Sequence, residues 1–77
     1  MAAIIKPGMY RHYKGGMFRV LTVAKHEETE EEFVVYHVQS LGFEQGIGQY
    51  WVRPLAVFAE EVEYKGKLLP RYKYISS

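Results

Sequence analysis

Every apolar segment of this chain is short, and this feature constrains its fold more than any other. Aromatic and β-branched residues gather in short runs that glycine and proline interrupt, and the longest runs are residues 17–25 and 33–39. Such runs are typical of strands. Only residues 55–60 place apolar side chains at helical spacing, and this segment is too short for a full helix without tertiary support. The pattern therefore predicts a mainly β chain.

The turn signals arrange these runs as antiparallel strands. The expected strands are residues 9–13, 17–25, 33–39, 50–53, 61–64 and 68–75, with a glycine-rich loop at 40–48. Val62 and Tyr64 are expected to face inward between exposed glutamates. A chain of 77 residues with so many short strands closes most economically as a highly bent sheet, because closure removes exposed edges. We therefore expect a single domain over residues 1–77. Its predicted fold is a small SH3-like barrel of five or six short antiparallel strands with one short helical or 3-10 turn. An OB-like barrel is the alternative.

The chain contains no cysteine, which excludes disulfides, thiolate metal sites and a cysteine nucleophile. A reducing, cytoplasmic location is therefore expected. No apolar stretch approaches the ~20 residues that span a bilayer, and the apolar residues 1–5 are too few for a signal peptide. We expect no membrane partner.

Charge is strongly segregated along the chain, although the formal net charge is only +1. Five of the acidic residues are glutamates within residues 27–32, whereas residues 1–25 and 65–77 carry only basic charges. The glutamate run is interpreted as a solvated connection whose self-repulsion keeps it open. Its alternative role is an acidic surface that contacts the basic ends or repels nucleic acid.

The three histidines do not form a recognisable metal site. His12, His26 and His37 fall on separate expected elements without the H-x-x-x-H or E-x-x-H spacing of metal ligands. No metal and no cofactor are therefore predicted. Ser40 lacks the strand-turn-helix elbow that exposes a nucleophilic hydroxyl. A small metal-dependent or hydrolytic enzyme that uses histidine and glutamate side chains remains the alternative function.

A group of aromatic and basic residues gives the best functional prediction. Trp51 and Arg53 project from one face of a short strand, and the first hairpin supplies further aromatic and basic groups nearby in a small barrel. Such a combination can stack on bases and neutralise phosphates, or hold an extended peptide. The alternative for Trp51 is a purely structural role as a core anchor. The predicted ligand-binding residues are Tyr10, His12, Tyr13, Lys14, His26, Tyr36, Trp51 and Arg53.

Five motifs resemble those of a mostly bacterial family of small proteins of unknown function. They are K-P-G-x-Y-R-H-Y-K-G at residues 6–15, V-A-K-H-x-x-T-x-E at 23–31, V-V-Y at 34–36, W-V-R-P-L-x-x-F at 51–58 and V-x-x-x-G-x-x-x-P-R-Y at 62–72. The resemblance covers nearly the whole chain. It implies an SH3-type barrel and supplies no activity.

These observations together predict a non-catalytic binding module that recognises a peptide, a protein or a nucleic acid. The isoelectric point near 8.0 is low for a dedicated nucleic-acid domain, and the glutamate run argues against one unless it lies on the far side of the molecule. A monomer or weak homodimer is expected. In a third hypothesis the role is structural, and residues 1–5 pair with a sheet edge of the same or a neighbouring chain.

Overall fold

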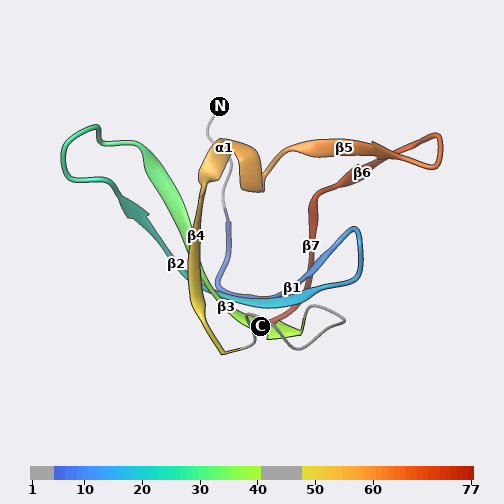
Figure 1. Cartoon of the computed structure of the whole chain (residues 1–77), viewed down its shortest axis with the longest axis horizontal. Coiled ribbons are helices and arrows are strands. Elements are labelled where there is room, and N and C mark those ends of the chain that lie inside the picture. The colour runs from blue at the N-terminus through green and yellow to red at the C-terminus, as the bar shows by residue number, and fades with distance from the viewer. Residues whose placement is uncertain (1–4, 41–47) are drawn as a thin grey trace.

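The computed structural model describes residues 5–40 and 48–77, which form seven strands and one short helix (Figure 1). The elements are β1 (Gly8–His12), β2 (Met17–Lys25), β3 (Glu32–Ser40), β4 (Tyr50–Pro54), α1 (Leu55–Phe58), β5 (Glu61–Tyr64), β6 (Lys67–Pro70) and β7 (Tyr72–Ser76). The predicted loop at 40–48 and the predicted pairing of residues 1–5 fall largely outside the described residues. No helix in the described part of the chain is long and apolar enough to cross a membrane.

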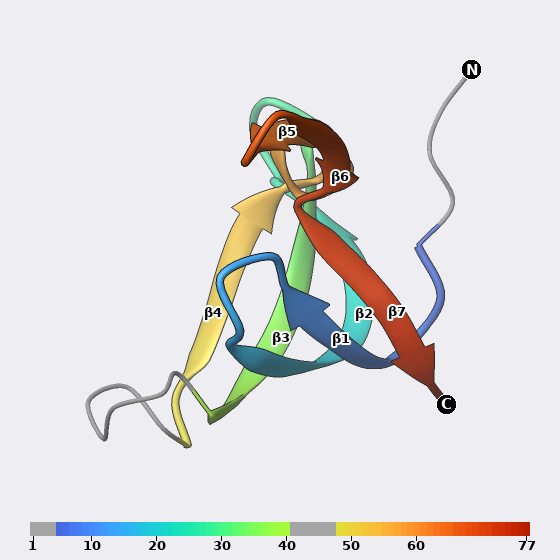
Figure 2. The same cartoon turned by 90° about the vertical axis from the view of Figure 1, so that its right-hand side faces the viewer.

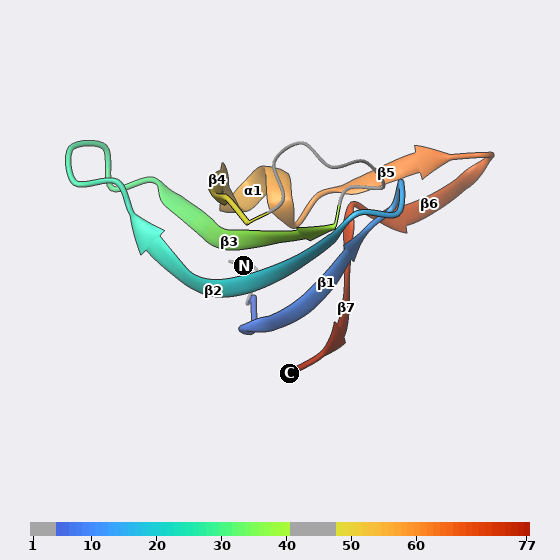
Figure 3. The same cartoon turned by 60° about the horizontal axis from the view of Figure 1, so that its bottom comes forward.

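The strands form two antiparallel sheets. The larger sheet has the order β4-β3-β2-β1-β7, and β5 and β6 form a separate hairpin. The larger sheet curves strongly, as β2 and β3 show in Figure 3. The pairing register of β2 with β3 shifts between Val20 and Thr22, and such an irregularity bends a strand and increases its twist. The prediction of a mainly β, SH3-like barrel with one short helical turn is confirmed, with seven strands instead of five or six.

The end of the chain differs from the sequence prediction. The expected strand at 68–75 divides at Arg71, because β6 pairs with β5 whereas β7 pairs with β1. The backbone N–H of Arg71 donates to Glu60 O, and its carbonyl accepts from the N–H of Tyr13, each at 2.9 Å. The prediction that Tyr64 faces inward is wrong. Tyr64 is exposed because the β5–β6 hairpin extends away from the larger sheet (Figure 1).

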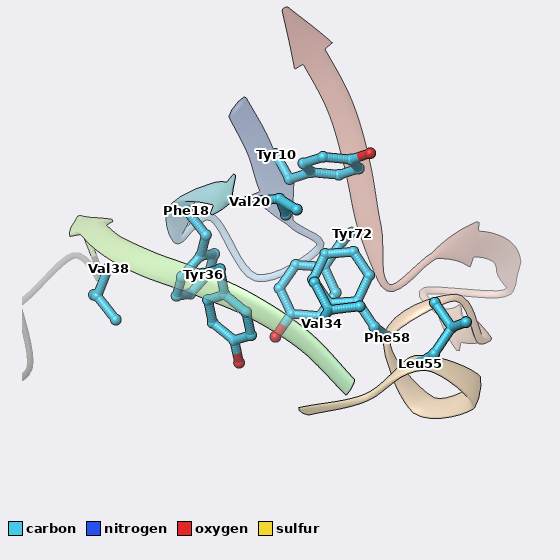
Figure 4. Packing of buried hydrophobic residues seen from close by; sticks show 9 residues of the cluster. All are labelled: Tyr10, Phe18, Val20, Val34, Tyr36, Val38, Leu55, Phe58 and Tyr72. Atoms are coloured by element: carbon cyan, nitrogen blue, oxygen red, sulfur yellow. The ribbon is translucent and has the colours of Figure 1, made fainter. Parts of the chain in front are cut away.

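The core lies between the inner face of the bent sheet and α1 (Figure 4). Phe58 of α1 stacks on Tyr72 with a centroid distance of 4.1 Å and an angle of 5° between the ring planes. The same ring meets Tyr10 edge-on at 5.5 Å. The buried residues are Tyr10, Phe18, Val20, Val34, Tyr36, Val38, Leu55, Phe58 and Tyr72. The single turn of helix thus seals one side of the core through an aromatic stack.

The acidic loop, residues 27–32, joins β2 to β3, includes the first residue of β3 and lies at one end of the molecule (Figure 1). Lys25 pairs with Glu32 at this end of the β2–β3 hairpin, and Met17 pairs with Ser40 at the other. Figures 1 and 3 both place the loop on the side opposite the turn that joins β1 to β2. Every residue of the acidic loop is exposed, so its charges are solvated. The position of the loop keeps these charges far from the β1–β2 turn.

Candidate aromatic and basic groove

An open groove of about 300 Å³ lies between the β1–β2 turn, β4 and the start of β7. Figure 2 shows these three elements on one side of the molecule. The hydrogen bond from Tyr13 N to Arg71 O ties the turn to the start of β7. The lining residues are His12, Lys14, Gly16, Phe18, Trp51, Arg53 and Tyr72.

The floor of the groove is aromatic. Phe18 and Tyr72 are buried, and their rings meet edge-on at 5.5 Å. Trp51 is half-buried, and its ring lies 6.4 Å from that of Phe18. Its indole N–H donates to Gln49 Oε1 at 3.2 Å. Trp51 therefore packs against the core with part of its surface and presents the rest to the groove.

Arg53 brings a positive charge onto this floor. Its guanidinium carbon lies 5.8 Å from the centre of the Tyr72 ring, within the range of a cation–π contact. A hydrogen bond with the Tyr36 hydroxyl raises the pKa of Arg53. Burial and a hydrogen bond with Tyr36 raise the pKa of Tyr72, so that phenol stays neutral. No carboxylate is among the described residues that line the groove, and its charge is therefore positive.

His12 is the titratable group of the groove. Burial lowers its pKa, and the positive charges of Arg53, Arg71 and Lys14 lower it further. Its Nδ1 accepts a hydrogen bond from the backbone N–H of Lys14 at 3.1 Å, so the neutral ring carries its proton on Nε2. His12 therefore sits in the groove as a neutral imidazole with one N–H donor.

A family model described as "Protein of unknown function (DUF1653)" matches residues 8–74. The chain belongs to the DUF1653 family. It is also similar to the crystal structure of a DUF1653 protein from Bordetella bronchiseptica, with 35% sequence identity and a TM-score of 0.79. That match covers 94% of this chain and 88% of the other. No curated protein matches the chain. The family resemblance expected from the sequence motifs is confirmed.

In this DUF1653 chain the groove brings together His12, Lys14, Trp51 and Arg53 from the residues predicted as ligand-binding. The other four lie elsewhere. Tyr10 is a core residue whose hydroxyl donates to Lys6 O at 2.8 Å, and Tyr36 is buried beneath the groove. The Tyr13 ring lies outside the groove, between His12 and Tyr64.

His26 is also separate from the groove, because it organises the acidic loop. Its Nδ1 accepts from the backbone N–H groups of Glu28 and Thr29 at 3.2 and 3.3 Å. Its backbone N–H donates to Glu31 O at 2.8 Å. These bonds account for a histidine at this position without any ligand.

Sequence reasoning missed Gly16, Phe18 and Tyr72 as groove residues. A Cβ at Gly16 would lie 3.0 Å from the Phe18 ring and 3.2 Å from Ser40 O, so glycine lets the turn pack closely on the groove floor. In the sequence, only the G-G pair before Phe18 and the P-R-Y motif could have indicated these three residues. Neither shows that β7 lies beside the first hairpin.

The histidine itself offers a test of this geometry. We expect a proton NMR titration of the DUF1653 chain to give His12 a pKa below the ordinary value of about 6.5. Arg53→Gln removes the cation whose charge lowers the pKa of His12 the most, so it should raise that pKa towards the ordinary value. A lowered pKa means that the unfolded wild-type chain binds a proton at His12 more readily than the folded chain does. The stability of the fold is therefore unaffected by this group above about pH 6.5 and declines as the pH falls below that value. A His12 pKa at or above 6.5, or one that Arg53→Gln leaves unchanged, would contradict the arrangement.

The described lining residues of the groove include no carboxylate that could orient His12 and no serine that could act as a nucleophile. Across residues 5–40 and 48–77, no cluster of three or more histidine or acidic side chains could hold a metal ion. The arrangement is suited to binding an anionic group next to a flat ring.

Proposed function

We propose that this chain is a non-catalytic binding module whose groove holds an anionic group beside a planar ring. The observation that carries the proposal is half-buried Arg53, whose guanidinium lies over the Tyr72 ring and shares the groove with no described carboxylate. A partly buried charge is costly unless a partner compensates for it. An anionic ligand would supply that compensation, and the exposed part of Trp51 would stack on its ring.

The size of the groove agrees with a small ligand fragment. About 300 Å³ is at the lower end of the range for small-molecule sites, enough for one ring system rather than an extended cofactor. Lys14 at the rim and the Nε2–H of His12 add donors for the anion. The lack of cysteine supports the cytoplasm as the compartment in which the module acts.

The single tryptophan of the chain reports directly on this groove. We expect thymidine 5′-monophosphate, which combines a ring with a phosphate, to change Trp51 fluorescence and the NMR shifts of His12. Arg53→Gln should weaken this binding about tenfold or more, because hydrogen bonds to charged groups contribute about 1.5–3 kcal/mol. Trp51→Ala, followed through the His12 shifts, should weaken it as well.

Lys25→Gln serves as the matched control, since it removes an equal charge at the acidic-loop end of the molecule. It should leave the affinity within about twofold, as expected for a screened, distant charge. An acidic peptide that contains one tyrosine is titrated in parallel as a ligand of the other class. If neither probe shifts Trp51 or His12, or if Arg53→Gln and Lys25→Gln bind equally well, the proposed function is refuted.

A further inference from the structure

We propose that the partner of this chain is a single-stranded nucleic acid, which places a base in the groove and passes across β1 onto the outer face of the larger sheet. This inference rests on the function proposed for the groove. It adds a second, separate set of contacts and names the chemistry of the partner.

A second hollow continues the groove on the other side of His12. It has a volume of about 140 Å³ and is lined by Arg11, His12, Tyr13, Leu69, Pro70 and Lys73. His12 lines both hollows, so the two form one path. Four cations border this path: Arg53 and Lys14 on one side of His12, and Arg11 and Lys73 on the other. Arg19 extends the path, since it lies on the neighbouring strand, diagonal to Arg11 on the outer face.

Nothing in the described fold accounts for the cations on the outer part of this path. Arg11 and Lys73 are exposed and directly opposite each other on β1 and β7, and like charges in this position destabilise a sheet. Within the described residues, the Arg11 side chain donates only to Met17 Sδ, at 3.5 Å. The one ion pair within the described residues joins Arg71 to Glu60, so none of the path cations is paired there with a carboxylate. An external polyanion would remove this repulsion.

The acidic loop does not interfere with such a partner. It lies at the opposite end of the β2–β3 hairpin from the β1–β2 turn (Figures 1 and 3). Three glutamates, Glu60, Glu61 and Glu63, lie on or beside β5 at the same end as the path (Figure 1), and Glu60 is paired with Arg71. The path cations Arg11, Lys14, Arg53 and Lys73 outnumber the other two, so this basic end of the molecule is net positive and the glutamate run lies on the far side from it.

The pairing of rings with charges favours nucleic acid over an acidic peptide. Each nucleotide carries both a planar base and a phosphate, which matches an aromatic groove followed by a series of cations. In an acidic peptide, the residues that carry the negative charges have no planar ring. A base must also be free to leave its stack to reach Trp51 and Tyr72, so the strand is single rather than duplex.

The test compares a ligand that fills only the groove with one that follows the whole path. Thymidine 5′-monophosphate and an octathymidylate are titrated by Trp51 fluorescence at several salt concentrations against the wild-type chain and Arg11→Gln/Lys73→Gln. We expect octathymidylate to bind at least tenfold more tightly than the mononucleotide. The double variant should lose most of that gain but bind the mononucleotide within about twofold of wild type. Two lost phosphate contacts should reduce the slope of log K against log salt by about 1.4.

The double variant should fold, because it removes a like-charge pair from the surface, and we expect its melting temperature to equal or exceed that of wild type. Lys25→Gln/Lys67→Gln removes the same charge outside the path and should retain the gain in affinity.

The inference is overturned if octathymidylate binds no more tightly than the mononucleotide, if the Lys25→Gln/Lys67→Gln control loses as much affinity as the double variant in the path, or if an acidic peptide of equal charge binds more tightly than octathymidylate. In each of these cases, binding of the mononucleotide in the groove would still support the proposed function. If no nucleotide binds but the acidic peptide with one tyrosine does, this inference fails and the groove function stands. If neither nucleotide nor peptide binds, both proposals fail.

Discussion

Replacing Phe58 with alanine is expected to lower the free energy of unfolding by about 3–5 kcal/mol. Phe58 is 1% exposed, stacks flat on Tyr72 and meets Tyr10 edge-on. Its removal leaves a cavity where α1 seals the core, and a single helical turn has no stability of its own to resist this loss. The change is large beside the total stability of a small domain, about 5–15 kcal/mol. Urea titration followed by circular dichroism measures it.

Val52→Ala provides the comparison for this prediction, because Val52 is 61% exposed and a surface substitution changes stability by only about 0.5 kcal/mol. Phe58→Leu should fall between the two variants. Since Tyr72 forms part of the groove floor, Phe58→Ala should also alter Trp51 fluorescence in the folded fraction. A loss below about 1 kcal/mol for Phe58→Ala would show that the aromatic stack does not hold α1 in place.

Gly8→Ala should produce the other large loss of stability. Gly8 has a φ of 142°, and a Cβ at this position would lie 2.6 Å from the backbone oxygen of Ser76 and 3.1 Å from Ser77 Cα. The obstructing atoms are main chain, so β7 must move away from β1. We expect a loss of at least about 1–3 kcal/mol from the backbone conformation alone, and a further loss from the displaced strand.

Gly15→Ala separates these two contributions. Gly15 also has a positive φ, 107°, but a Cβ there meets no atom of the described residues within 4 Å. It should therefore show only the conformational cost. Equal losses of unfolding free energy for Gly8→Ala and Gly15→Ala would mean that the close approach of β1 and β7 contributes nothing.

Much of the fold was predictable because its signals are local. Residues 17–25 match β2 in full, and the first turn and α1 follow from glycines and from apolar spacing next to one another in sequence. The division at Arg71 was not predictable in this way. Whether residues 68–75 form one strand or two depends on β5 and β1 as pairing partners, and these lie in different parts of the chain.

The candidate site shows the same division between local and distant information. Trp51 and Arg53 share a face because alternate residues of a strand do, and His12 and Lys14 belong to the adjacent turn. Tyr72 reaches the groove only because β7 pairs with β1. His26 was grouped with these residues by its chemistry, whereas its backbone contacts within the acidic loop determine its place.

The separation of the acidic loop from the basic end makes the molecule an electric dipole. In the field of any polyanion it rotates so that the basic end leads, and this orientation is set before the surfaces touch. Productive collisions then become more frequent at low ionic strength, an effect on the association rate that is distinct from the strength of the final contacts. Once the basic end contacts such a polyanion, the glutamates of the acidic loop would point away from it.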